Sequence, residues 1–147
     1  MINTILVTNR SGNVLLERFY GIPGEERSTW RAFLLKLGAE NLEDTTDEEE
    51  LVAAHRTVFV VYGSFGDLNI YMVGGDEYDE LGLSEVLRAV VITLKDACNG
   101  KLSEGSLLTK YGTACLYIDE IISQGTLEHV DKDRIKRSSK MKPVGDS

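Results

Sequence analysis

The fold is decided by residues 57–98, which read TVFVVYGSFGDLNIYMVGGDEYDELGLSEVLRAVVITLKDAC. This stretch opens with two apolar runs, Thr57–Tyr62 and Leu68–Val73, joined by five residues with glycines at positions 63 and 66. The pattern predicts a β-hairpin with a longer loop. The first run is almost entirely β-branched and aromatic, which is typical of a strand buried on both faces. The second run alternates, with one face formed by Leu68, Ile70 and Met72 and the other by Asn69, Tyr71 and Val73.

A helix is predicted directly after this hairpin. The segment GGDEYDEL, residues 74–81, interrupts the strand pattern and places acidic residues where a helix begins. Apolar residues then recur at helical spacing: Leu83, Val86, Leu87, Val90, Val91, Leu94 and Cys98. One wide apolar stripe predicts an amphipathic helix, in which each buried side chain contributes roughly 1.5–3 kcal/mol before entropy opposes it. The hairpin and this helix form the expected core.

A second pair of strands and another helix are predicted closer to the N-terminus. Ile2–Thr8 and Val14–Tyr20 have strand patterns, and Asn9–Asn13 has the composition of a turn. A helix follows from about Glu25 and is expected to end at Gly38. Its apolar stripe consists of Trp30, Phe33, Leu34 and Leu37.

A third helix is predicted after the central stretch, from about Leu107 to Ser123. Its apolar face is expected to contain Leu108, Tyr111, Cys115, Ile118 and Ile122. The resulting order β-β-α-β-β-α-α predicts an α/β (α+β) domain with an antiparallel or mixed sheet covered by helices. We expect one domain in residues 1–130, followed by a basic C-terminal tail in residues 131–147.

The charge of the chain is distributed unevenly. The net charge is −8, but residues 131–142 carry six basic and two acidic residues, a local charge of +4, and Asp146 adds −1, which leaves −11 for residues 1–130. An acidic body argues against nucleic acid as the main partner. The tail is either a solvated end or a contact for anionic lipid or an acidic partner. The residues that would make this contact are Lys132, Arg134, Lys136 and Arg137.

The residue types that indicate catalysis or metal binding do not occur in clusters. His55 and His129 stand alone and are expected at the surface. Residues 40–50 contain seven carboxylates without the spacing of a calcium loop, so they predict an exposed acidic loop. The two cysteines, Cys98 and Cys115, are expected to be buried and reduced. We therefore expect a cytoplasmic protein that is not an enzyme and needs no cofactor or metal.

The acidic group Asp76, Glu77, Asp79 and Glu80 has two interpretations. Carboxylates at the start of a helix are stabilised by the helix dipole, each by roughly 0.3–1 kcal/mol, which favours a capping role. The alternative is a contact with a partner protein. On the residues alone, the chain is a non-enzymatic interaction module whose partner is not specified.

Several short motifs occur along the chain in a fixed order: Asn9-Arg10-Ser11-Gly12, Phe19-Tyr20, Tyr62, Leu68, Asp79-Glu80-Leu81 with Glu85, and Asp119-Glu120 with Gly125. The order and spacing of these motifs and elements resemble one known family: the small (sigma) subunits of clathrin adaptor complexes, with coatomer zeta as a relative. The likeness covers about residues 1–128. Within the family, the opening MINTILVTNRSGNVLLERF and the segment KDRIKR (Lys132–Arg137) are most similar to the small subunit of TPLATE-type adaptor complexes.

This resemblance implies a longin-like fold, a five-stranded and mostly antiparallel sheet sandwiched by helices, with its fifth strand near Glu50–Ala54. It also implies a structural small subunit that packs against a large adaptin-like subunit and other subunits of an adaptor complex. A TPLATE-type member would act in clathrin-mediated endocytosis. It would be cytoplasmic and recruited to the plasma membrane or to clathrin-coated pits as part of a peripheral complex.

Two departures from the family pattern concern cargo recognition. Sigma chains that bind acidic dileucine signals carry a basic residue at the position of Leu15, and paired arginines in the central hairpin turn, where this chain has Gly63-Ser64. Without those cations an acidic peptide has no charge partner, and the acidic body repels it. Dileucine recognition is therefore not expected. The basic tail also replaces a leucine-rich closing helix.

Three alternatives remain. The first is a coatomer zeta or a conventional adaptor sigma subunit in intracellular transport. The second is a free-standing longin-type trafficking regulator, which would be a monomer, whereas an adaptor subunit would need its large partner. The third is an enzyme, which the absence of any clustered base, nucleophile or metal set disfavours.

Overall fold

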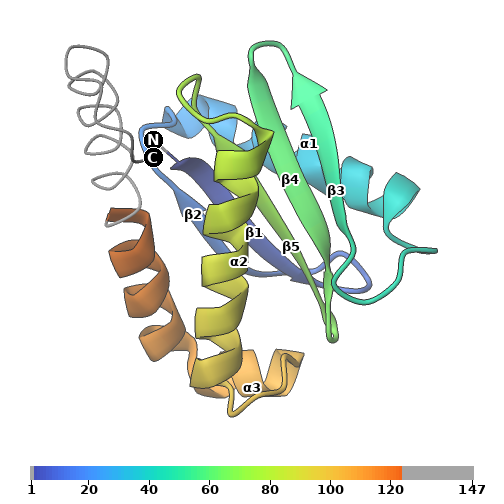
Figure 1. Ribbon diagram of the computed structural model, residues 1–147, viewed down its shortest axis with the longest axis vertical. Helices are drawn as coiled ribbons and strands as arrows, with labels where there is room; N and C mark the ends of the chain where they lie inside the picture. Colours follow the sequence, from blue (N-terminus) through green and yellow to red (C-terminus); the bar gives the residue numbers. More distant parts are fainter. Residues whose placement is uncertain (1, 124–147) are drawn as a thin grey trace, which may run out of the picture.

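Residues 2–123 are described by the computed structural model (Figure 1). The strands are β1 (Ile2–Asn9), β2 (Val14–Phe19), β3 (Glu50–His55), β4 (Val58–Phe65) and β5 (Leu68–Gly74). The helices are α1 (Gly24–Asn41), α2 (Glu80–Ala97) and α3 (Glu104–Thr109), and residues 111–123 are helical as well. The strands form one sheet in the order β2-β1-β5-β4-β3, with every neighbouring pair antiparallel.

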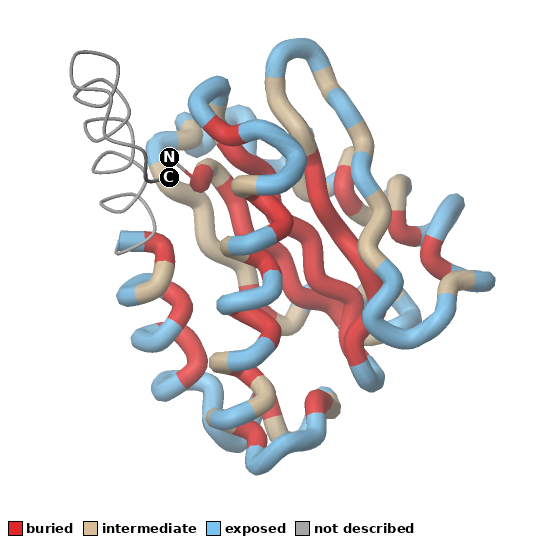
Figure 2. Tube along the Cα trace, in the orientation of Figure 1, coloured by how far each residue is buried: buried red, intermediate tan, exposed pale blue. Residues whose placement is uncertain are grey.

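The molecule has three layers, with the sheet in the middle. α1 covers one face of the sheet, and α2 with the 111–123 helix covers the other (Figure 1). Figure 2 shows that burial is greatest in the central strands and falls towards β3. The predicted α/β class and the five-stranded sheet between helices are confirmed. The fifth strand is β3, at the place expected for it.

The hairpin of β4 and β5 organises both cores. Leu68, Ile70 and Met72 belong to the core between the sheet and α2, whereas Tyr71 and Val73 belong to the core under α1. The alternation predicted for this strand is therefore confirmed. The apolar stripe of α2 packs on the first of these cores, through Leu83, Val86, Leu87, Val90, Val91, Leu94 and Cys98.

The turn of this hairpin is shorter than predicted. β4 continues to Phe65, so that only Gly66 and Asp67 connect it to β5. Gly63 and Ser64 are buried inside the strand and not in a loop. A Cβ at Gly63 would lie 2.6 Å from the carbonyl oxygen of Glu49, so this glycine allows a close approach of backbones. Sequence reasoning took it for a turn residue because both roles select glycine.

The end of α1 was also predicted wrongly. The helix passes through Gly38 and ends at Asn41. A Cβ at Gly38 would lie 1.8 Å from the hydroxyl oxygen of Tyr71, which crosses under the helix at this point. Gly38 is therefore a contact position between helix and sheet, and not a helix cap.

The predicted third helix is interrupted. α3 ends at Thr109, Lys110 leaves the helical conformation, and a second helix begins at residue 111. The interruption rotates the later helix relative to α3. As a result, Leu108 and Tyr111 are exposed, and the buried residues are Leu107, Ala114, Cys115, Ile118 and Ile122. The expectation was correct for the last three of these and wrong for Leu108 and Tyr111.

The surface position expected for His55 is wrong as well. Its ring is half-buried at the end of β3, with ring centroids 5.4 Å from Trp30 and 4.6 Å from Phe33. His129 lies outside the described residues. Both cysteines, Cys98 and Cys115, are buried and free, as predicted. Burial raises the pKa of the Cys98 thiol, which keeps it protonated.

Candidate partner-binding surface

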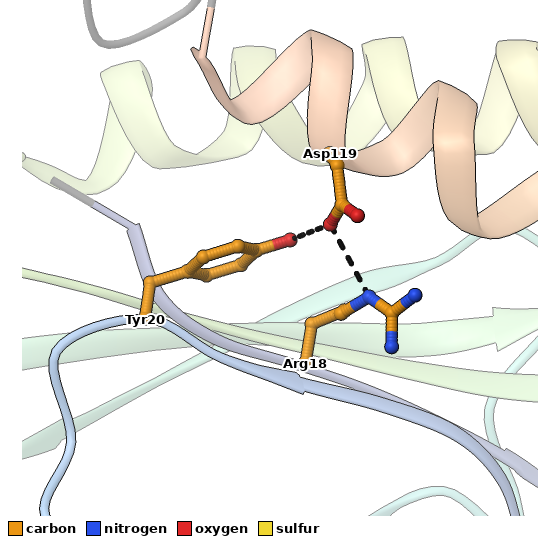
Figure 3. Close-up of polar contacts among 3 residues, drawn as sticks. All are labelled: Arg18, Tyr20 and Asp119. Atoms are coloured by element: carbon orange, nitrogen blue, oxygen red, sulfur yellow. Dashed lines mark hydrogen bonds and ion pairs between the residues drawn. The ribbon is translucent and has the colours of Figure 1, made fainter.

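A polar cluster ties the 111–123 helix to the sheet beside β2 (Figure 3). The hydroxyl of Tyr20 donates to Asp119 Oδ1 at 2.6 Å, and Nε of Arg18 donates to the same oxygen at 3.2 Å. Residues 18 and 20 reach the same carboxylate because alternate side chains of an extended chain point to one face. Arg18, Tyr20 and Asp119 are referred to below as the β2 clasp.

The clasp derives most of its strength from the tyrosine. The Arg18 and Asp119 side chains are 32% and 45% exposed, so their ion pair alone contributes little. Burial, together with the hydrogen bond to Asp119, raises the pKa of Tyr20 well above its usual value. The hydroxyl therefore remains a donor under all ordinary conditions.

β2 is also held from the opposite layer. Arg31 of α1 donates to both carboxylate oxygens of Glu17, at 2.7 and 2.8 Å. The guanidinium of Arg27 lies 5.5 Å from the ring centroid of Phe19. The strand is thus fixed by α1 on one face and by the β2 clasp on the other.

The helix held by the clasp exposes large apolar side chains, and so does α2. The most exposed large apolar side chains are Leu81 (76%) and Ile92 (61%) on α2 and Leu116 (70%) on the 111–123 helix, with Tyr117 beside them in sequence. No large apolar side chain of α1 is exposed to a comparable degree. Apolar exposure on one side is typical of a surface that binds another protein. Leu81, Ile92, Leu116 and Tyr117 are referred to as the α2-side apolar surface.

A groove of about 400 Å³ lies next to this surface, between α2 and the start of β3. Its apolar lining consists of Phe65, Val91 and Ile92. Its cations are already paired: Arg88 lies 3.5 Å from Glu50, and Lys95 pairs with Glu48. These two carboxylates belong to the stretch predicted as an exposed acidic loop, which therefore continues into β3 and contacts α2.

The acidic residues at the start of α2 make different contacts. Asp79 is the N-cap of α2 and accepts a hydrogen bond from the backbone N–H of Gly82 at 2.7 Å, which confirms the capping interpretation for this residue. Asp76 accepts from the Thr57 hydroxyl at 3.0 Å, and Glu80 is the first residue of the helix. A partner contact through Asp76, Glu77, Asp79 and Glu80 stays a prediction.

The positions at which dileucine-binding sigma chains carry basic residues are partly or fully buried in this chain. Leu15 is a half-buried apolar residue that packs against the core on the α2 side. Ser64, expected in the turn, is buried and donates to Asn69 Oδ1 at 2.7 Å. The turn carries another cation instead, because Arg10 donates to the carbonyl of Gly66 at 2.8 Å. Sequence reasoning did not connect Arg10 with this turn, since 56 residues separate the two positions.

Metal-binding clusters and membrane-spanning helices are not found among the described residues. In the range 2–123, no group of three or more histidines, cysteines or carboxylates is placed to hold a metal ion. No helix in the same range is long and apolar enough to cross a membrane. The basic residues Lys132, Arg134, Lys136 and Arg137 lie outside the described residues.

Comparison with known proteins gives a consistent result. The family model of the clathrin adaptor complex small chain matches residues 1–143. A TSET complex member of Dictyostelium discoideum, tstD, is 32% identical over 144 residues, which covers 97% of this chain and 94% of the relative. Coatomer subunit zeta-3 of Oryza sativa is 25% identical over 134 residues, covering 91% of this chain and 76% of the relative.

Structural comparison supports the same fold. One chain in a homology model of the full-length AP-3 complex in a stretched open conformation superposes with a TM-score of 0.62. The match covers 99% of this chain and 100% of the other, at 14% sequence identity. At this identity the likeness concerns the fold alone.

Proposed function

The chain belongs to the clathrin adaptor complex small chain family, and we propose that it is the small subunit of a TPLATE-type adaptor complex. In this role it packs against a large adaptin-like subunit, stabilises it, and acts in clathrin-mediated endocytosis. It is cytoplasmic and reaches the plasma membrane and clathrin-coated pits through the complex. It has no catalytic role of its own.

The observation that carries this proposal is the end-to-end match to the TSET complex member. That match covers 94% of the relative, whereas the matches to coatomer zeta-3 and to the probable coatomer zeta-B of Dictyostelium discoideum cover 76% and 78% of theirs. A TSET member is TPLATE-like, so the alignment favours this branch over the coatomer. Coatomer zeta remains the second candidate, because zeta-B is 31% identical over 142 residues.

The surface that best fits the large subunit is the α2-side apolar surface. Interfaces of permanent complexes are more apolar than the remaining protein surface, and isolated subunits therefore expose apolar side chains. Leu81, Ile92 and Leu116 are each exposed by more than 60%. The β2 clasp supports this surface because it holds the helix that carries Leu116 in place.

Two charged regions extend the proposal. The acidic group Asp76, Glu77, Asp79 and Glu80 lies at the N-terminal end of α2 and would form an additional protein contact. We propose one folded domain in residues 1–130 and a contact role for residues 131–147. There Lys132, Arg134, Lys136 and Arg137 would bind anionic lipid or an acidic partner.

The experiment that tests the proposal is affinity purification of the tagged protein from its native cells, followed by mass spectrometry. We expect one large adaptin-like subunit in near-equal amount, together with a medium-chain-like subunit and clathrin. A coatomer large subunit would replace the TPLATE-type assignment with the coatomer assignment. Recovery of the chain alone, or with only a small GTPase, would overturn the proposal in favour of a free-standing regulator.

Matched variants test the proposed surface in the same purification. Leu116→Asp places a charge on the α2-side apolar surface and is expected to lower recovery of the large subunit at least about tenfold, since a buried unpaired charge is costly at an interface. Ala32→Asp places the same charge on the exposed side of α1 and is expected to leave recovery unchanged. Equal recovery with both variants would exclude this surface as the binding site.

A further inference from the structure

The backbone of β3 has an open edge. His55 and Val58 close the β3–β4 hairpin as a pair, so the amide groups of His55, Ala53 and Leu51 point towards β4. The N–H and C=O groups of Glu50, Val52 and Ala54 consequently point out of the sheet. Within residues 2–123, no backbone group hydrogen-bonds to them along this edge.

This edge lacks the features that usually prevent strand pairing. Natural edge strands are protected by proline, lysine, bulges or covering segments. β3 has the sequence ELVAAH, contains neither proline nor lysine, and pairs with β4 over six positions without a register shift. Its central residue, Val52, is 47% exposed, and Ala54 is exposed on the same face. Figure 1 shows that α2 crosses the middle of the sheet and leaves β3 at the far side.

The sequence around β3 indicates what fits this edge. Glu49 and Glu50 lie at the start of the strand and Arg56 follows its end, with an apolar centre between them, while Glu48 pairs with Lys95 of the same chain. Arg56 is exposed, and it makes no hydrogen bond or ion pair with the described residues. A strand that is acidic at one end and basic at the other is complementary to itself in the antiparallel direction. In the parallel direction, like charges would meet.

We propose that β3 pairs antiparallel with β3 of a second copy of this chain and so joins two sheets into one. Pairing centred on Val52 uses the outward groups of Glu50, Val52 and Ala54 in both copies. Ala54 then lies opposite Glu50 of the second copy, and Arg56, in the turn after the strand, lies near the acidic start of that copy's β3. The contact is two-fold symmetric, so each copy offers the same surface to the other and the assembly closes as a dimer.

This inference goes beyond the proposed function and does not depend on it. The outward backbone groups of β3 lie beyond the groove of Glu48, Glu50 and Ile92 that borders the α2-side apolar surface, and our proposal is that they stay accessible when a large subunit covers that surface. Self-pairing would therefore connect two adaptor complexes. An edge of six residues buries less than the roughly 1,200 Å² of a stable complex, so the pairing is expected to be weak and dependent on concentration.

Sedimentation equilibrium of the full chain tests the proposal. We expect the average mass to rise from 16.3 kDa towards twice that value as the protein concentration increases. Val52→Lys places two like charges opposite each other at the symmetry axis and is expected to abolish the rise. Val52→Thr retains a β-branched side chain and is expected to preserve it. Thermal melting followed by circular dichroism verifies that both variants are folded.

Cross-linking tests the register. Val52→Cys brings two thiols to directly opposite positions, where Cβ atoms are about 5 Å apart, whereas Ala54→Cys leaves its thiols roughly 13 Å apart along the strand. A short bismaleimide should therefore link the first variant at least about tenfold faster. The native Cys98 and Cys115 are buried and do not compete.

Three outcomes would overturn the proposal. The first is a monomer at every concentration, and the second is a dimer that persists in Val52→Lys. The third is a chain that stays monomeric by itself but loses another adaptor subunit in the Val52→Lys variant. That result would assign the edge to a strand of the other subunit. Faster cross-linking of Ala54→Cys would exclude the register centred on Val52.

Discussion

The two edges of the sheet are built differently. β2 is held on both faces, by the β2 clasp from the 111–123 helix and by the Arg31–Glu17 pair from α1. Its ladder with β1 contains a register shift between Val7 and Thr8. Within residues 2–123, β3 has an unbroken ladder on one side and no strand on the other, and its central side chain is half exposed.

This difference gives the two edges different roles: β2 contributes to the stability of the fold, whereas β3 is available for association. The polar side chains of Glu17, Arg18 and Tyr20 are bound by groups of the same chain, so they contribute to folding and offer little to a partner. Within residues 2–123, the outward backbone groups of β3 have no backbone partner, and the exposed side chains beside them are apolar. β2 is therefore the closed edge, because its polar side chains are already bound, and β3 is the open edge.

The largest effect is expected from a change that removes the core on which both edges depend. Leu87 is fully buried in the stripe of α2. Leu87→Asp would bury an unpaired carboxylate and cost about 5 kcal/mol or more, which is comparable with the whole free energy of unfolding of a domain. We expect an unfolded protein by circular dichroism that is absent from any complex. Ala89→Asp, on the exposed side of the same helix, should remain folded.

A smaller effect is expected at the closed edge. Asp119→Ala removes the acceptor shared by Tyr20 and Arg18 and leaves the half-buried tyrosine hydroxyl without it. The free energy of unfolding should fall by about 1–3 kcal/mol, measured by urea denaturation. Asp44→Ala removes an exposed carboxylate of the 42–49 loop and should change the free energy of unfolding by less than about 0.5 kcal/mol. Equal effects of the two variants would contradict the role assigned to the clasp.

The pH dependence of stability sharpens the same comparison. Burial and the hydrogen bond to Asp119 raise the pKa of Tyr20, so the folded chain keeps this proton at a pH where the unfolded chain loses it. The unfolded state then binds fewer protons, and the free energy of unfolding falls as pH rises above about 10. Below that pH the contribution of Tyr20 is fully present.

Tyr20→Phe is expected to make this alkaline decrease shallower, by at most about 1.4 kcal/mol per pH unit. Part of the slope should remain, because burial also raises the pKa of Tyr62 and Tyr71. Urea denaturation at a series of pH values between 9 and 11 measures the slope. An unchanged slope in the variant would show that the clasp is not formed in solution.

Local patterns in the sequence predicted most of the fold and little of the site. The alternation from Leu68 to Val73 and the stripe of α2 depend only on periodicity, and both were found as expected. Gly38 and Gly63 were misjudged because a glycine selected for a close contact looks the same as one selected for a turn. The break at Lys110 has no proline or glycine at that position to announce it.

The β2 clasp was missed for a different reason. Tyr20 and Asp119 were each recognised as part of a family pattern, but 99 residues separate them. A contact of this range depends on where the 111–123 helix packs against the sheet, which no local pattern contains. The α2-side apolar surface was likewise hidden, since its exposed residues Leu81, Ile92 and Leu116 fit an apolar pattern as well as buried ones do.

The smallest predicted effect concerns the turn at the open edge. Arg56 has φ 59°, a left-handed conformation that costs a residue other than glycine or asparagine roughly 1 kcal/mol. Arg56→Asn should relieve part of this strain and raise the free energy of unfolding by about 0.5–1 kcal/mol at a dilute, monomeric concentration. The same variant should weaken self-pairing, because the cation near the acidic start of the second copy's β3 is lost. Higher stability together with weaker association would show that the open edge retains a strained arginine for contact with another chain and not for folding.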